Sequence, residues 1–365
     1  MKKRYIFLEI LAVIVAFVFG AIVMTGLVLV LPRKAKQVTN INKLEKEVTV
    51  TDKGIADAVE NIYDATVVVI TSKDGKVMGS GSGFVYKTDD KKAYIITNHH
   101  VVSVGNEFSI TLSNEDIVKA KLIGSDPYAD IAVLSVDKDK VLATAKLGST
   151  DSIRVGDTVF AVGAPLDSSA YSFTVTRGIL SGKDRAVEVS LNSSSQADWV
   201  MRVLQTDTAI NSGNSGGPLC NSNGEVIGIT NMKLSKTGVE GMGFAITIED
   251  AKEASEAIIS GKEKEYPYLG VTMYNVSAIY YSNPELLKAN VSSGAFIYEV
   301  DADSSAYKAG LRPGDIVIGI GKDEIKSVAT LRYNLYKHEI GEKVTFKINR
   351  DGEEKNLNIK LEAKK

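Results

Sequence analysis

The sequence is poor in the residues that cross-link chains or carry protons. A single cysteine, Cys220, excludes an intrachain disulfide, and three histidines leave few candidates for proton-transfer chemistry. No charge of one sign dominates either, because 43 basic residues face 45 acidic ones. We therefore expect neither a disulfide-stapled scaffold nor a nucleic-acid partner.

Charge is nearly absent from residues 5–31, an apolar run that only Glu9 interrupts. A run of this length can cross a bilayer with some tilt. It ends in Leu31, Pro32 and Arg33 without the small-residue exit of a cleaved signal, so we expect an uncleaved transmembrane anchor, with a cleaved signal peptide as the alternative. Basic residues flank both ends, so charge does not fix the orientation. A very short cytoplasmic tip before a long soluble part favours export of the bulk of the chain.

The next residues lack long helical patterns. Residues 33–53 are polar and Lys-rich, which fits a stalk, and residues 55–65 have apolar positions at helical spacing. From there to about residue 246, short β-branched runs are bounded by Gly, Asp, Asn or Ser. This pattern predicts an antiparallel barrel or sandwich, and its length fits two small barrels. The strands that we expect are 65–72, 81–87, 93–98, 108–113, 117–125, 131–136, 158–164 and 225–231.

A helix and a second unit follow. Thr247 is a plausible N-cap for a helix that begins with acidic residues and ends at Gly261. Residues 266–363 contain their own apolar pattern and form a separate core. The elements expected there are a short helix at 284–290, a strand at 294–300, a short helix, a turn at Pro313-Gly314 and a buried strand within 304–320, a helix at 328–338 and a hairpin within 343–361 that turns at Asp351-Gly352.

The candidate nucleophile lies in TAINSGNSGGPLCN, residues 208–221. Amide hydrolysis builds negative charge on the carbonyl oxygen, and two converging backbone N–H groups stabilise it. Glycine at position 213 permits the dihedrals that aim the N–H of Gly213 beside that of Ser215, so these two residues are the expected oxyanion hole. Two glycines after the serine allow close backbone approach, and Pro218 fixes the exit. An ordinary tight turn needs fewer such residues.

A serine nucleophile needs a base, which a third group must orient. His99 and His100 are adjacent in ITNHHVV, whereas His338 ends a predicted helix, where a cation is favoured for structural reasons. Asp130 directly precedes the run IAVLSV and is the expected acid, with Asp126 as its rival. The chain order His100, Asp130 and then the serine fits a two-barrel protease whose groups meet at the cleft.

The segments ITNHHVV, DIAVLSV and TAINSGNSGGPL resemble the three catalytic segments of HtrA/Deg (DegP/DegS-like) serine proteases, which have a chymotrypsin-like fold. The family pattern T-N-x-H-V implies His100 as base and leaves His99 as the variable neighbour. It also implies Asp130 as acid and Ser215 as nucleophile. One departure is Ser212, where many relatives have proline.

The resemblance covers about residues 54–363, because the second unit resembles the PDZ domain of these proteases. It implies a mainly β fold in which a chymotrypsin-like double β-barrel, residues 54–261, precedes an α+β PDZ domain, residues 262–365. Residues 1–53 are then the cytoplasmic tip, a transmembrane helix and a polar stalk. It further implies a homotrimer, no metal or cofactor, and unfolded or damaged proteins as substrates.

The residue six before the nucleophile lies at the base of the primary pocket in chymotrypsin-like folds. Here it is Ala209, so no carboxylate awaits Arg or Lys. Ile229, Thr230 and Phe244 lie in neighbouring apolar stretches that we expect to form the walls. The sequence therefore predicts cleavage after small or medium aliphatic residues such as Val or Ala.

The motif YLGV at residues 268–271 matches the PDZ loop that receives a peptide's terminal carboxylate. Leu269, Gly270 and Val271 are the matching positions, and the peptide would add as a strand. The alternative is that the loop only packs its own domain.

Together these features predict a serine endopeptidase held in the cell membrane by one span, with the protease and PDZ domains on the extracytoplasmic side. Two further interpretations stay open. One is a signalling protease that cuts a single membrane-bound regulator, and the other is a chaperone or binding protein that holds clients without cutting them. Residues 166–178 and 231–241 are the suspected activation loops.

Overall fold

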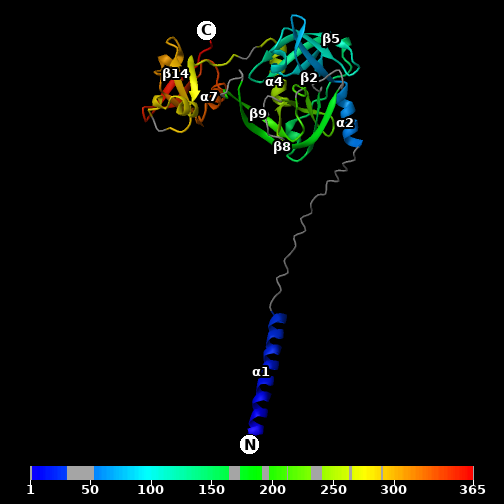
Figure 1. Cartoon of the computed structure of the whole chain (residues 1–365), viewed down its shortest axis with the longest axis vertical. Coiled ribbons are helices and arrows are strands. Elements are labelled where there is room, and N and C mark those ends of the chain that lie inside the picture. Colours follow the sequence, from blue (N-terminus) through cyan, green and yellow to red (C-terminus); the bar gives the residue numbers. More distant parts are fainter. Residues whose placement is uncertain are drawn as a thin grey trace. The chain divides into compact units, whose positions relative to one another are not determined.

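The computed structural model describes residues 2–30, 53–163, 173–190, 197–211, 213–231, 241–262, 265–288 and 291–364. Ser212, nearly all of the expected stalk and most of the two suspected activation loops lie outside these ranges. The chain divides into two units, residues 1–50 and 51–365, which are treated separately (Figure 1).

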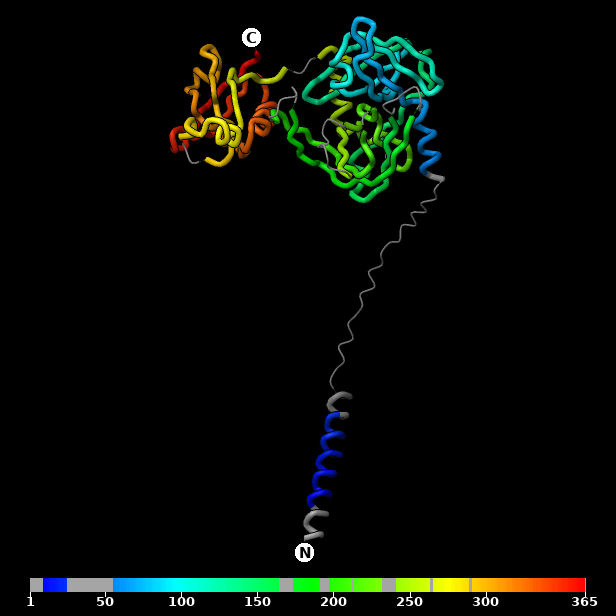
Figure 2. The backbone as a smooth tube through the Cα atoms, viewed as in Figure 1, coloured from blue at the N-terminus to red at the C-terminus, as the bar shows by residue number. Residues whose placement is uncertain are grey.

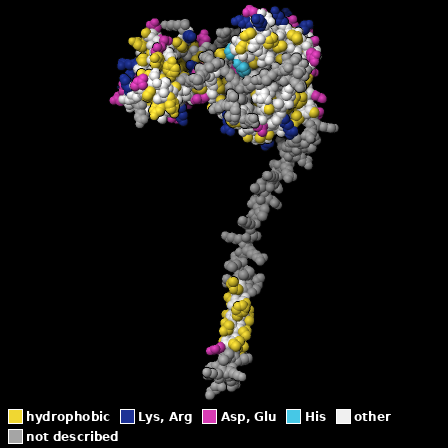
Figure 3. Space-filling model, in the orientation of Figure 1, with side chains coloured by type: hydrophobic (Ala, Val, Ile, Leu, Met, Phe, Trp, Pro, Cys, Tyr) yellow, Lys and Arg dark blue, Asp and Glu magenta, His cyan; other side chains and the backbone are white. Residues whose placement is uncertain are grey.

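The first unit contains helix α1, Lys2–Val30. Its side chains from Glu9 to Met24 are all exposed, and most are apolar, as the hydrophobic surface of this helix in Figure 3 shows. Within the described residues, no helix combines the length and the apolarity needed to span a bilayer. A helix thus occupies the position of the expected transmembrane anchor, and its role as a membrane span stays a prediction.

The second unit opens with helix α2, Lys53–Tyr63, whose apolar face packs into the main core through Ala58 and Ile62. Six strands then close into a barrel in the order β1-β2-β3-β6-β5-β4. Neighbouring strands in this barrel are antiparallel. Their bounds are Thr66–Lys73 for β1, Lys76–Thr88 for β2, Lys92–Thr97 for β3, Glu107–Thr111 for β4, Ile117–Asp126 for β5 and Ile131–Asp137 for β6.

A second closed barrel follows in the order β10-β11-β12-β9-β8-β7. Figure 2 shows the chain tracing the two barrels one after the other, the first in blue to cyan and the second in green. The strands of the second barrel are β7 Thr158–Gly163, β8 Thr174–Val189, β9 Trp199–Thr206, β10 Pro218–Asn221, β11 Val226–Thr230 and β12 Gly243–Thr247. Closing both sheets leaves neither barrel with a free edge.

Each barrel has its own apolar interior, and a third core lies where the barrels meet. Ile95 and Leu134 belong to the interior of the first barrel, and Leu180 and Leu204 to that of the second. Phe84 and Phe160, from β2 and β7, are buried together in the shared core. Helix α4, Ile248–Ile259, covers this core, and Thr247 caps it by accepting a hydrogen bond from the N–H of Asp250, as expected.

The C-terminal domain is a sheet in the order β13-β14-β15-β17-β18, with β16 paired to β15. The hairpin of β17 and β18 turns at Asp351-Gly352, both at positive φ, as the sequence predicted. The expected helix at 284–290 is only a short 3₁₀ turn, and a helix that the sequence did not predict, α5, precedes it. Element bounds are β13 Val271–Asn275, α5 Val276–Ser282, η4 Pro284–Leu286, β14 Ala295–Val300, α6 Ser305–Lys308, β15 Ile316–Ile320, β16 Asp323–Glu324, α7 Val328–Leu335, β17 Lys343–Arg350 and β18 Glu353–Lys360.

Helix α7 joins the two domains of this unit. Arg332 donates from Nη1 to the backbone oxygen of Asp198 at 2.8 Å and to its Oδ2 at 2.9 Å, beside β9. Tyr336 stacks near Trp199, with ring centroids 5.4 Å apart, and near Tyr128, at 5.1 Å. The C-terminal domain is therefore attached by an ion pair and an aromatic cluster as well as by the connecting chain.

Candidate active site

The candidate base and acid come from the first barrel. A short helix, α3, His99–Val102, follows β3 and carries His100, while Asp130 ends the turn before β6. His100 Nδ1 lies 2.7 Å from Asp130 Oδ2, and the backbone N–H of His100 donates to Asp130 Oδ1 at 3.0 Å. One carboxylate thus fixes both the ring and the backbone of the histidine.

Asp130 is held firmly in place. Its backbone has φ of +53°, which is rare for a residue with a side chain, and its exposed fraction is 2%. The Nδ2 of Asn98 and the N–H of His99 donate to its backbone oxygen at 2.9 and 3.2 Å. These bonds offset the strain of the left-handed conformation and aim the carboxylate at His100.

The second barrel supplies another hydrogen-bond donor to the carboxylate of Asp130. Asn231, directly after β11, donates from Nδ2 to Asp130 Oδ2 at 2.7 Å and is fully buried. Burial by itself raises the pKa of Asp130, but the hydrogen bonds and charge of His100 and the amide of Asn231 outweigh it, so the pKa lies below its usual range. The carboxylate is therefore ionised at neutral pH.

The candidate nucleophile lies in the turn before β10, where Ser215 is 5% exposed. Its backbone oxygen accepts from the N–H of Ser82 on β2 at 2.8 Å. The Ser82 hydroxyl donates to the oxygen of Gly213 at 2.6 Å, and the N–H of Gly216 donates to the oxygen of Thr230 at 2.9 Å. The serine turn is thus bound to both barrels at once.

Two glycines show how closely the histidine segment approaches the serine turn. A Cβ on Gly81 would lie 2.7 Å from Val101, the neighbour of His100, and 2.9 Å from the backbone oxygen of Ser215. A Cβ on Gly216, whose φ is +86°, would lie 2.2 Å from the oxygen of Ser82 and 2.4 Å from Thr97 Oγ1. Side chains at these positions would separate the two barrels at the site.

The expected oxyanion-hole residues lie in the same turn. Gly213 has φ of +103°, a conformation that glycine adopts without strain, and its oxygen is tied to Ser82. Ser215 follows two residues later, at the turn's centre.

The expected pocket residues divide into two groups. Ile229 and Thr230 are fully buried, and Thr230 Oγ1 donates to the oxygens of Asn214 and Gly217, so it supports the serine turn. Ala209 is exposed, and its backbone oxygen accepts from the side chain of Asn214 at 3.2 Å. Phe244 is half-buried, and its oxygen accepts from the N–H of Asn231. Of the four, only Ala209 and Phe244 are exposed or partly exposed.

The rival residues have other contacts. His99 Nδ1 lies 2.9 Å from Ser125 Oγ, and His338 Nδ1 lies 2.9 Å from Glu342 Oε1. Asp126 Oδ1 accepts from the N–H groups of Tyr128 and Ala129 and so closes the turn that leads to Asp130.

The expected carboxylate loop precedes β13, the strand at one end of the described sheet order. Leu269 is buried and Gly270 has φ of +69°, while Val271 begins the strand. Among the described strands, β13 pairs with β14 alone, so none of them occupies its other edge.

Sequence reasoning missed two residues of this site, Asn231 and Ser82. Both end up beside the candidate groups because two distant strands close into different barrels. The only local signal was an Asn that ends a strand and a Ser between two glycines, which are common in any β protein.

Comparison with known proteins agrees with this geometry. Residues 81–229 match a trypsin-like peptidase domain and residues 267–361 a PDZ domain. The serine protease Do-like HtrA of Bacillus subtilis (strain 168) is 43% identical over 298 residues, which covers 80% of this chain and 66% of that relative. Do-like HtrB of the same organism is 36% identical over 383 residues, covering 96% and 82%. The solved HtrA-type protease AlgW with decapeptide aligns with a TM-score of 0.64 at 28% identity, covering 85% of this chain and 99% of that one.

The two closed barrels, the site between them and the C-terminal sheet thus coincide with sequence matches along most of the chain. The chain belongs to the Do-like HtrA serine proteases, with a trypsin-like peptidase domain followed by one PDZ domain.

Proposed function

We propose that Ser215, His100 and Asp130 hydrolyse peptide bonds by acyl transfer. The observation that carries this is the buried carboxylate of Asp130, 2.7 Å from His100 Nδ1. Its Oδ2 accepts a hydrogen bond from the Nδ1–H of His100, which keeps the proton on Nδ1 and leaves Nε2 free to act as the base. A buried, ionised carboxylate also stabilises the imidazolium that forms in the reaction.

In the proposed first step, Ser215 Oγ attacks the substrate carbonyl carbon while its proton passes to His100 Nε2. Negative charge then develops on the carbonyl oxygen, toward which the N–H groups of Gly213 and Ser215 are expected to point. The C–N bond breaks as His100 returns the proton to the leaving amine. Water, activated by the same base, releases the acid and restores Ser215.

We propose unfolded or damaged proteins as substrates, cut after small or medium aliphatic residues. Support comes from Ala209, which puts no charge at the expected base of the primary pocket, and from the half-buried Phe244. A peptide-library digest tests the preference. Preferred cleavage after Arg or Lys would contradict it.

We propose that the PDZ domain takes the C-terminal tails of proteins on the open edge of β13, with Leu269, Gly270 and Val271 at the carboxylate. The positive φ of Gly270 and the unpaired strand edge support this. A C-terminal peptide should bind the protein, and its C-terminally amidated form should bind markedly less.

Attachment and assembly belong to the same proposal. The exposed apolar surface of α1 supports a single membrane span, because a helix that is apolar all round needs an apolar environment. Extracytoplasmic placement and a homotrimer follow from the family resemblance. Alkaline extraction of membranes tests the membrane span, since an anchored chain stays in the pellet. Light scattering of the detergent-solubilised protein tests the trimer.

The decisive experiment is degradation of an unfolded, casein-like protein by the wild type and by Ser215→Ala. Cleavage by the wild type but not by Ser215→Ala supports the proposed endopeptidase activity. If neither cuts, even with a C-terminal peptide present, and both suppress aggregation, the chaperone interpretation replaces it. Cleavage of a single membrane-bound regulator, with casein spared, would favour the signalling role.

A further inference from the structure

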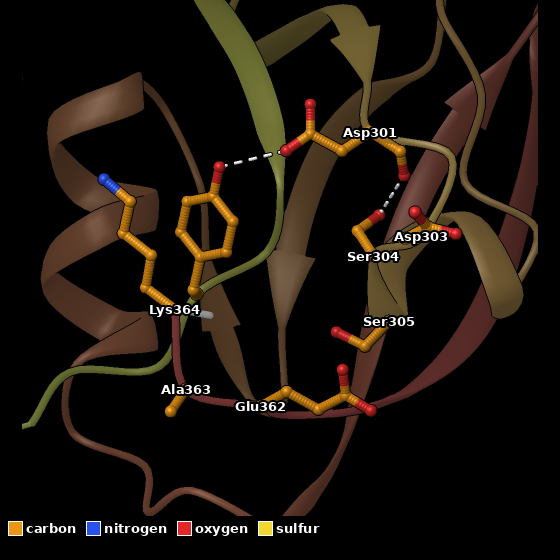
Figure 4. Close-up of a pocket in the computed structure, with 8 residues that line it drawn as sticks. Asp301, Asp303, Ser304, Ser305, Glu362, Ala363 and Lys364 are labelled. Carbon is orange, nitrogen blue, oxygen red and sulfur yellow. Dashed lines mark hydrogen bonds between the residues drawn. The ribbon is translucent and has the colours of Figure 1, made fainter.

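A hollow of about 250 Å³ lies in the PDZ domain beside the expected carboxylate loop. One wall is the segment from Asp301 to Ser305, and the other is the end of the chain from Glu362 to Lys364 (Figure 4). Ligand pockets for whole small molecules usually measure about 300–1,000 Å³. This hollow therefore fits one side chain or a comparably small group.

Negative charge predominates in the hollow. Asp301, Asp303 and Glu362 line it, and Lys364 is the one cation among its lining residues. Lys364 lies over the ring of Tyr268, with Nζ 5.8 Å from the centroid, and Figure 4 shows its ammonium group extending away from Ser305. Within the described residues, the carboxylates of Asp303 and Glu362 make no hydrogen bond or ion pair. The hollow thus has unneutralised charge that a cationic group would complement.

Ser305 provides an independent indication that a ligand belongs there. It is only 6% exposed, and its Oγ is buried without a hydrogen-bond partner among the described residues. Figure 4 shows this hydroxyl directed into the hollow, near Glu362. A buried polar atom without a partner costs about 1–3 kcal/mol. A donor group seated in the hollow would remove that cost.

The wall of the hollow is bonded to the carboxylate loop. The N–H of Asp301 donates to the oxygen of Gly270 at 2.8 Å, and the hydroxyl of Tyr268 donates to Asp301 Oδ2 at 3.0 Å. A Cβ on Gly270 would lie 2.4 Å from the Cβ of Ser304, so the two segments are in close contact. The hollow and the expected carboxylate loop are therefore built from directly bonded segments.

We propose that this hollow binds an alkylammonium or guanidinium group, from a lysine or arginine side chain of another polypeptide or from a free polyamine. Such a group donates several hydrogen bonds, which suits Ser305 Oγ, Glu362 and Asp303, and its charge is favourable next to the ring of Tyr268. A bare metal ion fits less well, because no three carboxylates, thiols or imidazoles of the described residues converge on one point. The site is separate from the serine turn and needs no peptide hydrolysis.

The test is calorimetric titration of the full-length protein at low salt. The probes are N-acetyl-lysine-methylamide, its uncharged Nε-acetyl derivative, and spermidine. We expect the charged probes to bind saturably and the acetylated one to bind at least about 10-fold more weakly, since about 1.4 kcal/mol corresponds to a factor of ten. Binding of the lysine amide alone identifies a side-chain ligand, and binding of spermidine alone identifies a free amine.

Two variants and a matched control assign the binding to the hollow. Glu362→Gln and Ser305→Ala should each weaken binding of the charged probe by about 10-fold or more, as expected for the loss of a hydrogen bond to a charged group. Asp323→Asn removes an exposed carboxylate elsewhere in the domain and should change nothing. Ser305→Ala removes only a hydroxyl without a partner, so the protein should stay folded, as melting will show. Equal binding of the acetylated probe, or binding that both variants leave unchanged, would overturn the proposal.

Discussion

Asp130 is the residue on which the whole site converges. Histidine on one side and Asn231 on the other bind the same carboxylate oxygen, each at 2.7 Å. The candidate groups could be identified from the sequence because it has only three histidines and one serine in a glycine-rich segment, so few other residues could perform the chemistry. The contribution of Asn231 could not be predicted from the sequence. It arises only because folding brings the end of β11 in the second barrel against the turn before β6 in the first barrel.

Replacing Asn231 by alanine should slow the reaction. The variant leaves the buried carboxylate with one hydrogen bond fewer, worth about 1.5–3 kcal/mol for a charged group. We expect kcat to fall about 10- to 100-fold while KM stays unchanged, because the side chain of Asn231 contacts Asp130, the proposed acid. Steady-state kinetics on a peptide substrate measure both constants. Asn356→Ala, an exposed change on β18, is the control, and an unchanged kcat for Asn231→Ala would contradict the assignment.

The lowered pKa of Asp130 predicts a pH-dependent contribution to stability. A group whose pKa is lower in the folded state stabilises the fold above its unfolded pKa, about 3.9 for Asp, and loses that effect as the pH falls through the folded pKa. The Tm difference between wild type and Asp130→Asn should therefore be large near neutral pH and shrink below about pH 4. A difference that grows toward acid pH would show that the pKa is raised instead.

At the scale of elements, the sequence predicted strands where β-branched residues run together, and it missed β8, β9, β10 and β12. Strand β8 has few buried positions and contains Gly178, Gly182 and several charged residues, so its sequence resembles a loop. Strand β10 has only four residues, Pro218–Asn221, directly after the serine turn. Such strands form because barrel closure pairs them on both sides, which no local pattern encodes.

The serine turn depends on the absence of a side chain at position 216. Gly216→Ala would place a Cβ 2.2 Å from the oxygen of Ser82 and displace Ser215, the proposed nucleophile. Misplacement by about 1 Å can cost about 100-fold in rate, so we expect at least that loss with the fold retained by circular dichroism. Gly156→Ala is the matched control, because its φ of +96° imposes the same backbone strain while nothing lies within 4 Å of its Cβ. Equal activity of the two variants would exclude the steric explanation.

At the scale of the whole molecule, neither barrel contains the site alone, and the PDZ domain is attached to the second barrel by α7. The density of short strands predicted the two barrels, and a separate apolar pattern predicted the C-terminal unit. The attachment could not be predicted, because Arg332 of α7 and Tyr336, the residue after this helix, contact Asp198 and Trp199 at the start of β9, more than a hundred residues away in sequence. The expected membrane span stays a proposal.

Breaking the ion pair of Arg332 should loosen this attachment. Its side chain is 25% exposed and that of Asp198 is 14% exposed, so removal leaves a largely buried carboxylate without its cation. We expect Arg332→Ala to destabilise the protein by about 1–3 kcal/mol and to lower its Tm. Lys326→Ala, whose partner Glu324 is exposed, should cost at most about 1 kcal/mol. If both variants melt alike, the contact contributes nothing to the assembled fold.

The central claim is that Ser215 is a nucleophile activated by His100. The most direct measurement is mass-spectrometric detection of its reaction with a fluorophosphonate, in which Oγ bonds to phosphorus, fluoride leaves and His100 takes the proton. The full-length wild type should carry one adduct, on Ser215, and His100→Ala should react far more slowly although it is folded. Labelling that is equally fast in His100→Ala, or that falls on another serine, would contradict the account.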